Sequence, residues 1–237
     1  MSDDLATRQA RARLILRKLG RAYPDAKCGL DFQSPLHLLV ATILSAQCTD
    51  ERINQVTPAL FARYQTAEAF ANADLDELKD YLRSVNYYQT KAKKIIECCR
   101  QLVERHHGQV PRTMEELVAL AGVGRKTANV VLSEAYGVPG ITVDTHMGRL
   151  ARRMGLTVEQ QPEKVEADLM QVFSRRMWNR ANHLIITHGR RVCTARNPQC
   201  ANCVLARVCP KVGVGSSRTA AATTDDDSAS PEPDPAN

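Results

Sequence analysis

The sequence contains no uncharged stretch long enough to cross a membrane and no apolar core of the kind found in secretory signal peptides. Residues 1–20 are instead amphipathic, with leucines interspersed among arginines. These absences predict a cytoplasmic protein that has no membrane partner.

Sustained alternation of apolar and polar residues is also absent, so no β-strand is predicted. Apolar residues recur at helical spacing instead. The predicted helices cover residues 35–47, 51–64, 75–82, 91–107, 126–136, 144–154, 162–173 and 180–188. The fold class is therefore all-α. Because no internal repeat is found, periodicity leaves open whether the chain forms one large helical domain or two small ones.

Large apolar residues are missing from the end of the chain, where none follows Val214. Residues 212–237 are rich in Ala, Thr, Ser, Asp and Pro, and cannot bury enough surface to offset the entropy cost of ordering. We predict a disordered acidic tail over residues 212–237. Its composition favours a solubilising role over competition with a polyanion for basic surface.

Basic residues dominate the rest of the chain. The whole sequence has 32 lysines and arginines against 26 acidic residues, a formal net charge of +6. Residues 212–237 hold one basic and five acidic residues, so the remainder carries +10. This charge favours binding to a phosphate polyanion, with an affinity that falls steeply with salt. A basic surface that is merely solvated would give the same composition.

The most specific motif lies over residues 117–128, which read as a helix, a tight glycine hairpin and a second helix. Thr113 and Glu116 fit a capping box at the start of the first helix. The hairpin is Gly122-Val123-Gly124, and its glycines permit positive φ and close approach of the backbone to a ligand.

Arg125 and Lys126 open the second helix of this motif. The N–H groups of the hairpin and of the helix N-terminus together predict a phosphate site, with Lys126 close to it. Glycine hairpins are common, but one that runs into Arg-Lys-Thr at a helix start is much more specific.

Cysteines fall into two groups. Four are scattered and are predicted to pack in the core as small apolar residues: Cys28, Cys48, Cys98 and Cys99. Four are clustered, with six, two and five residues between them: Cys193, Cys200, Cys203 and Cys209. Clustering in a cytoplasmic protein favours a metal site over disulfides. Structural zinc sites usually use two C-x2-C pairs and only one is present, so the spacing favours a [4Fe–4S] cluster over zinc.

Three features occur in a fixed order: the glycine hairpin with Lys126, the segment Val-Asp-Thr-His at 143–146, and the four-cysteine loop. Over residues 10–210 the chain resembles the endonuclease III family, bifunctional DNA glycosylase/AP lyases of the helix-hairpin-helix superfamily. The resemblance implies an all-α protein of two lobes with DNA bound across the cleft between them.

The resemblance also implies a division of the chain. Residues 1–27 would form an N-terminal helix that belongs to the cluster lobe. Residues 28–139 would form a six-helix lobe with the helix-hairpin-helix, residues 140–211 the iron-sulfur cluster lobe, and residues 212–237 the tail.

The implied function is base excision repair. The enzyme would flip oxidised pyrimidines out of double-stranded DNA, excise them and cleave the abasic site by β-elimination. The partner would be double-stranded DNA that contains oxidised pyrimidines or abasic sites, and the cofactor a [4Fe–4S] cluster. The protein would act as a monomer and be nucleoid-associated when bound to DNA.

Lys126 and Asp144 are the candidate catalytic residues. A neutral lysine amine can displace the base at C1′ and form a Schiff base, which acidifies the C2′ proton. Asp144 can move the proton or stabilise positive charge on the sugar. The alternative makes Lys126 a solvated helix residue and Asp144 only an N-cap, and Asp144 can serve both purposes.

Further DNA contacts are implied by the resemblance. The backbone of Gly122, Val123, Gly124 and Arg125 would bind phosphate. Gln47 would fill the gap left by the flipped base, and Tyr87 stands where many relatives place a leucine wedge. His146 would line the pocket. The alternatives are a solvated Gln47, a half-buried loop aromatic at Tyr87 and a packed His146, while Trp178 is predicted to be a core anchor.

The sequence departs from the usual family pattern at three places: Ala121 replaces a proline, Cys48 replaces an alanine, and Arg196 is the one basic residue between Cys193 and Cys200. None of these changes removes a catalytic group. Two rival classes are an adenine-mismatch glycosylase and a non-catalytic iron–sulfur protein that binds DNA. Lys126 and the short polar tail argue against the first, and the pairing of Lys126 with Asp144 argues against the second.

Overall fold

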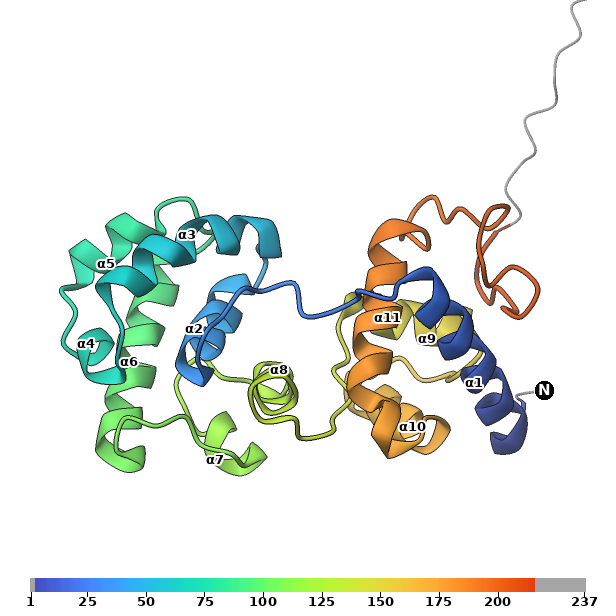
Figure 1. The fold of residues 1–237 in the computed structure, drawn as a ribbon, viewed down its shortest axis with the longest axis horizontal. Coiled ribbons are helices and arrows are strands. Elements are labelled where there is room, and N and C mark those ends of the chain that lie inside the picture. The colour runs from blue at the N-terminus through green and yellow to red at the C-terminus, as the bar shows by residue number, and fades with distance from the viewer. Residues whose placement is uncertain (1–2, 216–237) are drawn as a thin grey trace, which may run out of the picture.

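The computed structural model describes residues 3–215, and the protein is all-α over this range (Figure 1). The helices are α1 (Leu5–Ala22), α2 (Pro35–Ser45), α3 (Asp50–Arg63), α4 (Ala67–Ala71), α5 (Leu75–Leu82), α6 (Tyr88–His106), α7 (Met114–Val118), α8 (Arg125–Tyr136), α9 (Thr145–Arg153), α10 (Pro162–Val172), the 3-10 turn η1 (Arg175–Met177) and α11 (Trp178–Arg191). From residue 216 onward the predicted acidic tail lies outside the described residues.

Most helices begin at a residue whose side chain accepts a hydrogen bond from the first turn, which satisfies one of the otherwise unpaired N–H groups. These N-caps are Asp4, Ser34, Thr49, Thr66, Asp74, Thr113 and Asp144. One half of the predicted capping box is present, because the amide of Glu116 donates to Thr113 Oγ1 at 3.3 Å. The Glu116 carboxylate accepts at 2.6 Å from the Thr113 hydroxyl rather than from its backbone N–H.

Two boundaries differ from the sequence prediction in a way that matters for the site. The helix predicted over 35–47 ends at Ser45, because Ala46 leaves the helical conformation with ψ of 116° and Gln47 is left-handed with φ of 56°. The helix predicted from residue 91 begins at Tyr88, directly after Tyr87, which is also left-handed with φ of 57°. Apolar periodicity cannot report a single left-handed residue, so these ends were not predictable from it.

The chain forms two separate hydrophobic cores. The first is built by α2–α8 around the long helix α6, with Phe70, Leu38 and Ile95 fully buried in it. The second is built by α1, α9, α10 and α11, with Ile15, Leu150 and other apolar residues. Helix α1 therefore packs with the C-terminal half of the chain, as Figure 1 shows.

The scattered cysteines behave differently from one another. Cys98 and Cys99 are buried in the first core, as predicted. Cys28 and Cys48 lie in loops and are only partly buried against the same core. Trp178 packs against the second core and its indole N–H donates to the carbonyl of Phe173 at 3.0 Å, which confirms its structural role.

Two segments cross between the cores, residues 23–34 and residues 137–144, and the first half of α11 fixes both. Arg180 donates to the carbonyls of Tyr23, Pro24 and Ala26 in the first crossing. The Asn182 side chain is 4% exposed. In the second crossing, its Nδ2 donates to the Gly140 carbonyl at 2.9 Å, and its Oδ1 accepts from the backbone N–H of Thr142 at 3.0 Å. The second crossing leads directly into Asp144.

No helix in the described part of the chain has both the length and the apolar character needed to traverse a bilayer.

Asn182→Ala is expected to lower the free energy of unfolding by about 1–3 kcal/mol, because it leaves a buried N–H and a buried carbonyl without partners. Denaturant unfolding of the full chain measures this effect. Asn72→Ala is the matched control, since Asn72 is exposed and bonds only to the Glu68 carbonyl of its own helix. Equal losses in the two variants would contradict the role assigned to Asn182.

Candidate active site

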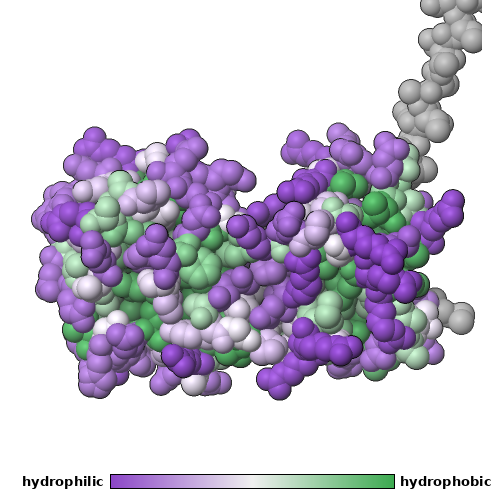
Figure 2. All heavy atoms as spheres, viewed as in Figure 1, coloured by the Kyte–Doolittle hydropathy of each residue, from purple (hydrophilic) through white to green (hydrophobic). Residues whose placement is uncertain are grey.

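We call the helices around the first core the first lobe and those around the second core the second lobe. A pocket of about 190 Å³ lies between the two lobes, and both Lys126 and Asp144 line it. Its walls come from α8, from α11, from the end of α2 and from residues 27–30, which we call the strap. Besides Lys126 and Asp144, the wall includes the side chains of Lys27, Cys28, Asp50, Glu134, His183 and Arg190. The molecular surface is indented where the lobes meet (Figure 2).

Lys126 is the second residue of α8, and its side chain is exposed at the pocket. The N-cap of α8 is Gly124, which has no side chain to occupy the first N–H groups of the helix. The positive end of the helix dipole therefore faces the surroundings of Lys126 and is open to an anion.

Asp144 is the N-cap of α9, and its Oδ1 accepts from the Met147 amide at 2.7 Å. The side chain is also half-buried in the wall of the pocket that contains Lys126. No partner among the described residues binds Oδ2. The capping interaction fixes the carboxylate and leaves one oxygen for chemistry, so the structural and the catalytic interpretations are compatible.

The two glycines of the hairpin have different roles. Gly122 has φ of 77°, and a Cβ there would come within 3.2 Å of the Lys94 side chain. Gly124 is extended and open, and a Cβ there would meet no atom within 4 Å. Val123 is 6% exposed and its amide donates to the Leu120 carbonyl at 3.1 Å. The side chain of Val123 therefore belongs to the core, and its N–H is already used within the turn.

Arg125 is engaged within the protein. Its guanidinium donates to both carboxylate oxygens of Glu166 on α10, at 2.8 and 3.0 Å. The Glu166 side chain is 7% exposed, and the pair joins the first lobe to the second. The charge of Arg125 thus compensates a buried carboxylate, in addition to whatever its backbone N–H contributes at the helix terminus.

Gln47 and Tyr87 lie outside the pocket but are held together. Both are exposed, and Tyr87 is 67% exposed, so the half-buried alternative for this residue is wrong. Asn86 donates from Nδ2 to the Gln47 carbonyl at 2.7 Å. Lys91, which is 6% exposed, donates to the carbonyls of Leu44 and Ala46 and so fixes the chain just before Gln47.

His146 packs against neighbouring helices and is not part of the pocket wall. A Cβ on Gly189 of α11 would come within 3.1 Å of the His146 Cβ, and Arg149 Nη2 lies 3.2 Å from its Nδ1. Burial lowers the pKa of His146, although the nearby Asp144 carboxylate acts in the opposite direction. The packing interpretation is the one that fits this geometry.

Two ion pairs at the pocket were not predicted from the sequence. Asp50 of α3 lies 2.7 Å from Arg190 of α11, and Glu134 of α8 lies 3.1 Å from His183 of α11. A signal was present for Glu134, because positions 126, 130 and 134 share one face of a helix. Its partner His183 is about 50 residues away in sequence and Arg190 is still further from Asp50, so no local pattern could have paired them.

The four clustered cysteines surround one small cavity together with Arg153 and His188. Arg153 lies 3.3 Å from Cys193 Sγ, and the Leu205 amide donates to Cys203 Sγ at 3.3 Å. His188 Nε2 lies 3.5 Å from Cys203 Sγ, and burial lowers the pKa of His188 to about 4. No three metal-binding side chains of the described residues converge as ligands of a single ion would. Four thiols around a shared cavity, with cationic and N–H donors nearby, fit a polynuclear cluster of high negative charge.

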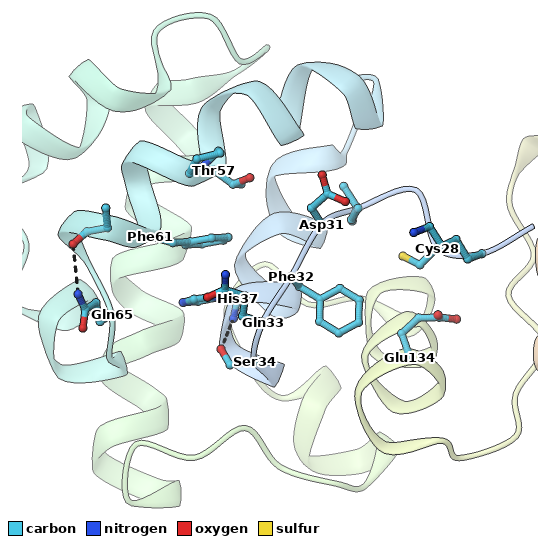
Figure 3. A pocket seen from close by; sticks show the side chains of 14 residues that line it. Cys28, Asp31, Phe32, Gln33, Ser34, His37, Thr57, Phe61, Gln65 and Glu134 are labelled. Atoms are coloured by element: carbon cyan, nitrogen blue, oxygen red, sulfur yellow. Dashed lines mark hydrogen bonds between the residues drawn. The ribbon is translucent and has the colours of Figure 1, made fainter. Parts of the chain in front are cut away.

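A larger cavity of about 1130 Å³ lies on the first lobe between the segment 27–34 and helices α2 and α3 (Figure 3). His37 and Phe61 stack in it with ring centroids 4.1 Å apart. It contains neither Lys126 nor Asp144, but it shares Cys28 and Glu134 with the smaller pocket. The candidate chemistry is therefore in the smaller pocket.

A helix-hairpin-helix beside an interlobe pocket, together with a four-cysteine loop, defines a class of DNA glycosylases. Residues 40–175 match the model of the HhH-GPD superfamily of base excision DNA repair proteins. Residues 193–209 match the iron-sulfur binding domain of endonuclease III.

Individual relatives specify the family further. The chain is 51% identical over 207 residues to endonuclease III of Synechocystis sp., covering 87% of this chain and 94% of the relative. It is 40% identical to endonuclease III of Escherichia coli K12, covering 82% of this chain and 92% of the relative. The chain belongs to the endonuclease III family. It is a DNA glycosylase/AP lyase of base excision repair that carries a [4Fe–4S] cluster.

Solved structures agree with this assignment. A trapped endonuclease III–DNA covalent intermediate superposes with a TM-score of 0.82 at 41% identity, covering 86% of this chain and 96% of that one. A thermostable thymine-DNA glycosylase superposes with a TM-score of 0.76 at 19% identity, which shows only that the fold is shared.

Arg125→Ala is expected to lower the free energy of unfolding by about 1–3 kcal/mol, because it leaves the buried Glu166 carboxylate without its partner. Combining it with Glu166→Gln should restore part of the loss, since the amide carries no charge to compensate. Denaturant unfolding of the single and the double variant measures both effects. If Arg125 served only as a DNA contact, the single variant would be as stable as the unmodified protein.

Proposed function

We propose that this enzyme excises oxidised pyrimidines from double-stranded DNA through a Schiff base on Lys126 and cleaves the resulting abasic site by β-elimination. The observation that carries the proposal is the meeting of Lys126 from α8 and Asp144 from the N-terminus of α9 in one interlobe pocket. DNA, as a polyanion, suits the basic body of the chain.

In the proposed reaction, the neutral amine of Lys126 attacks C1′ of the extruded nucleotide while the bond from C1′ to the base breaks. The base leaves as an anion and takes a proton from water. Asp144 accepts a proton from the lysine nitrogen and returns it to the ring oxygen O4′, so that the sugar ring opens and gives the protonated Schiff base. Loss of a C2′ proton then expels the 3′ phosphate, which leaves the strand nicked. The Met147 amide keeps the Asp144 carboxylate oriented during these transfers.

We assign the DNA contacts to two surfaces. Near Lys126, the open N-terminus of α8 and the backbone at Gly122, Gly124 and Arg125 would bind a phosphate of the damaged strand. At the other surface, Gln47 and Tyr87 would enter the gap left by the flipped base. Support comes from their shared left-handed backbone conformation, which is costly for residues with side chains and typical of functional positions.

Cys193, Cys200, Cys203 and Cys209 would ligate the [4Fe–4S] cluster. Bound there, the cluster would supply a rigid cross-link for a loop with few apolar residues. Arg153, at the end of α9, donates to the carbonyls of Thr194 and Ala195 and thereby joins this loop to the helix that Asp144 caps. We further propose that the protein acts as a monomer and is nucleoid-associated when bound to DNA.

Lys126→Ala is expected to abolish adducts trapped by borohydride on a duplex with an abasic site, because it removes the amine that forms the Schiff base. Lys27→Ala is the matched control, since Lys27 is a second amine in the same pocket. Denaturing gel electrophoresis of the trapped complex measures both. Adducts that persist in Lys126→Ala and disappear in Lys27→Ala would assign the nucleophile to Lys27 instead.

Asp144→Asn is expected to cut turnover by roughly 10²–10⁴-fold, the range for a positioned proton-transfer group. Asparagine caps helices about as well as aspartate, so the melting temperature should change little. Single-turnover excision and thermal unfolding of the same preparation separate the two effects. Turnover close to that of the unmodified enzyme would leave Asp144 with a capping role alone.

Cys203→Ser is expected to reduce the iron content and the broad visible absorption of a [4Fe–4S] cluster, and to destabilise the second lobe. Cys48→Ser is the control, because Cys48 is a partly buried cysteine packed against the other core. Metal analysis of anaerobically purified protein checks both. Stoichiometric zinc without iron, or iron loss in the control alone, would refute the ligand assignment.

A further inference from the structure

One end of the pocket holds a carboxylate–imidazole pair that the proposed reaction does not use. Glu134 Oε1 on α8 lies 3.1 Å from His183 Nε2 on α11, and the two side chains are 16% and 18% exposed. Both residues line the pocket that contains Lys126 and Asp144. The pair therefore lies in the active-site pocket, with one member from each lobe.

The two helices place this pair at the opposite end of the pocket from Lys126. Lys126, Val130 and Glu134 follow one another on one face of α8, so Glu134 is about 12 Å further along the helix axis than Lys126. On α11 the pocket residues run from Arg190, beside Asp50, back to His183. A lysine side chain and a pyrimidine ring placed end to end span this length. With C1′ at the amine of Lys126, the far edge of the base would point toward Glu134.

The carboxylate of Glu134 is oriented for recognition. Its Oε1 is held by His183 and also lies 3.3 Å from the Ser133 hydroxyl, which donates to it. Oε2 has no partner among the described residues. Cys28 of the strap lines the pocket together with Glu134, and burial raises the pKa of its thiol to about 11. A neutral thiol there provides an apolar contact for the face of a ring.

We propose that Glu134, oriented by His183, reads the edge of the extruded base and selects oxidised pyrimidines that present a ring N3–H. Uracil- and thymine-derived lesions carry N3–H, which Glu134 Oε2 can accept. Cytosine-derived lesions carry a lone pair at N3, which would face the carboxylate, and their donor at this edge is the 4-amino group instead. This inference rests on the proposed excision of oxidised pyrimidines and adds the residue that discriminates among them.

A site built around one hydrogen bond rejects an analogue that lacks the donor, because a buried polar group is then left unpaired. The alternative is that Glu134 and His183 only tie the lobes together, as Arg125 and Glu166 do. The two interpretations predict different effects of a Glu134 substitution on the cleavage of an abasic substrate. An abasic site has no base edge, so a residue that reads the base has nothing to contact there.

The test compares 5-hydroxyuracil with 5-hydroxycytosine in otherwise identical duplexes, since these lesions differ only at position 4 and at the N3 proton. The full-length enzyme carrying its cluster is measured for kcat/KM on each lesion and for strand cleavage at a preformed abasic site. Glu134→Gln is the main variant, because its side chain has nearly the same shape and can both donate and accept. Glu166→Gln is the control that loosens a lobe-to-lobe pair outside the pocket.

In Glu134→Gln the preference for 5-hydroxyuracil over 5-hydroxycytosine is expected to fall by about tenfold, the effect of losing one discriminating hydrogen bond. Cleavage of the abasic duplex should stay within about twofold of the unmodified enzyme, and Glu166→Gln should leave the lesion preference unchanged. His183→Gln should shift the preference in the same direction, since it removes the group that orients the carboxylate.

An unchanged preference in Glu134→Gln would overturn the inference. An equal loss of activity on lesion and abasic substrates would also overturn it, because a pair that only joins the lobes would affect both substrates alike. Failure of the proposed function is distinguishable from both results, because the unmodified enzyme itself would then excise neither lesion.

Discussion

The buried amide of Asn182 is the interaction on which the placement of the candidate active site depends. It donates to Gly140 and accepts from Thr142, and Asn129 of α8 donates to the Ile141 carbonyl between them at 3.1 Å. Both side chains are nearly excluded from solvent, so each hydrogen bond is costly to lose. A segment without regular structure is thereby fixed at three successive residues. Asp144 follows two residues later, in the same pocket as Lys126.

The lobes are joined differently from the way each lobe is held together. Within a lobe, apolar side chains form a closed core. Between the lobes there are ion pairs and amide-to-backbone hydrogen bonds, among them Asp50–Arg190 at the pocket and Arg125–Glu166 outside it. An apolar junction would close the cleft by excluding water. A polar junction tolerates water, and its hydrogen bonds have fixed directions. Both properties suit a site that must admit a charged nucleotide.

Two of the four non-glycine residues with positive φ in the described part of the chain lie where the DNA gap would be. Gln47 and Tyr87 have positive φ although neither is glycine, and Asn86 and Lys91 hold the surrounding backbone. Lys91 buries a cation to do so, and desolvation lowers its pKa. The amine is satisfied by two carbonyls at the end of α2, which the helix itself leaves unpaired. The buried Lys91 thus caps α2 and also fixes the backbone just before the exposed Gln47.

The sequence by itself determined the helical class, the helix-hairpin-helix, the four-cysteine loop and the pair of residues that carry the proposed chemistry. These depend on local spacing, such as the glycines at 122 and 124 or Thr113 with Glu116, and local spacing acts before the chain folds. It did not determine that Arg125 binds Glu166, that His146 packs against Gly189, or that Glu134 faces His183. Only the tertiary structure decided these, because each joins residues about 40 to 50 positions apart whose side chains meet only once the two cores have formed and docked.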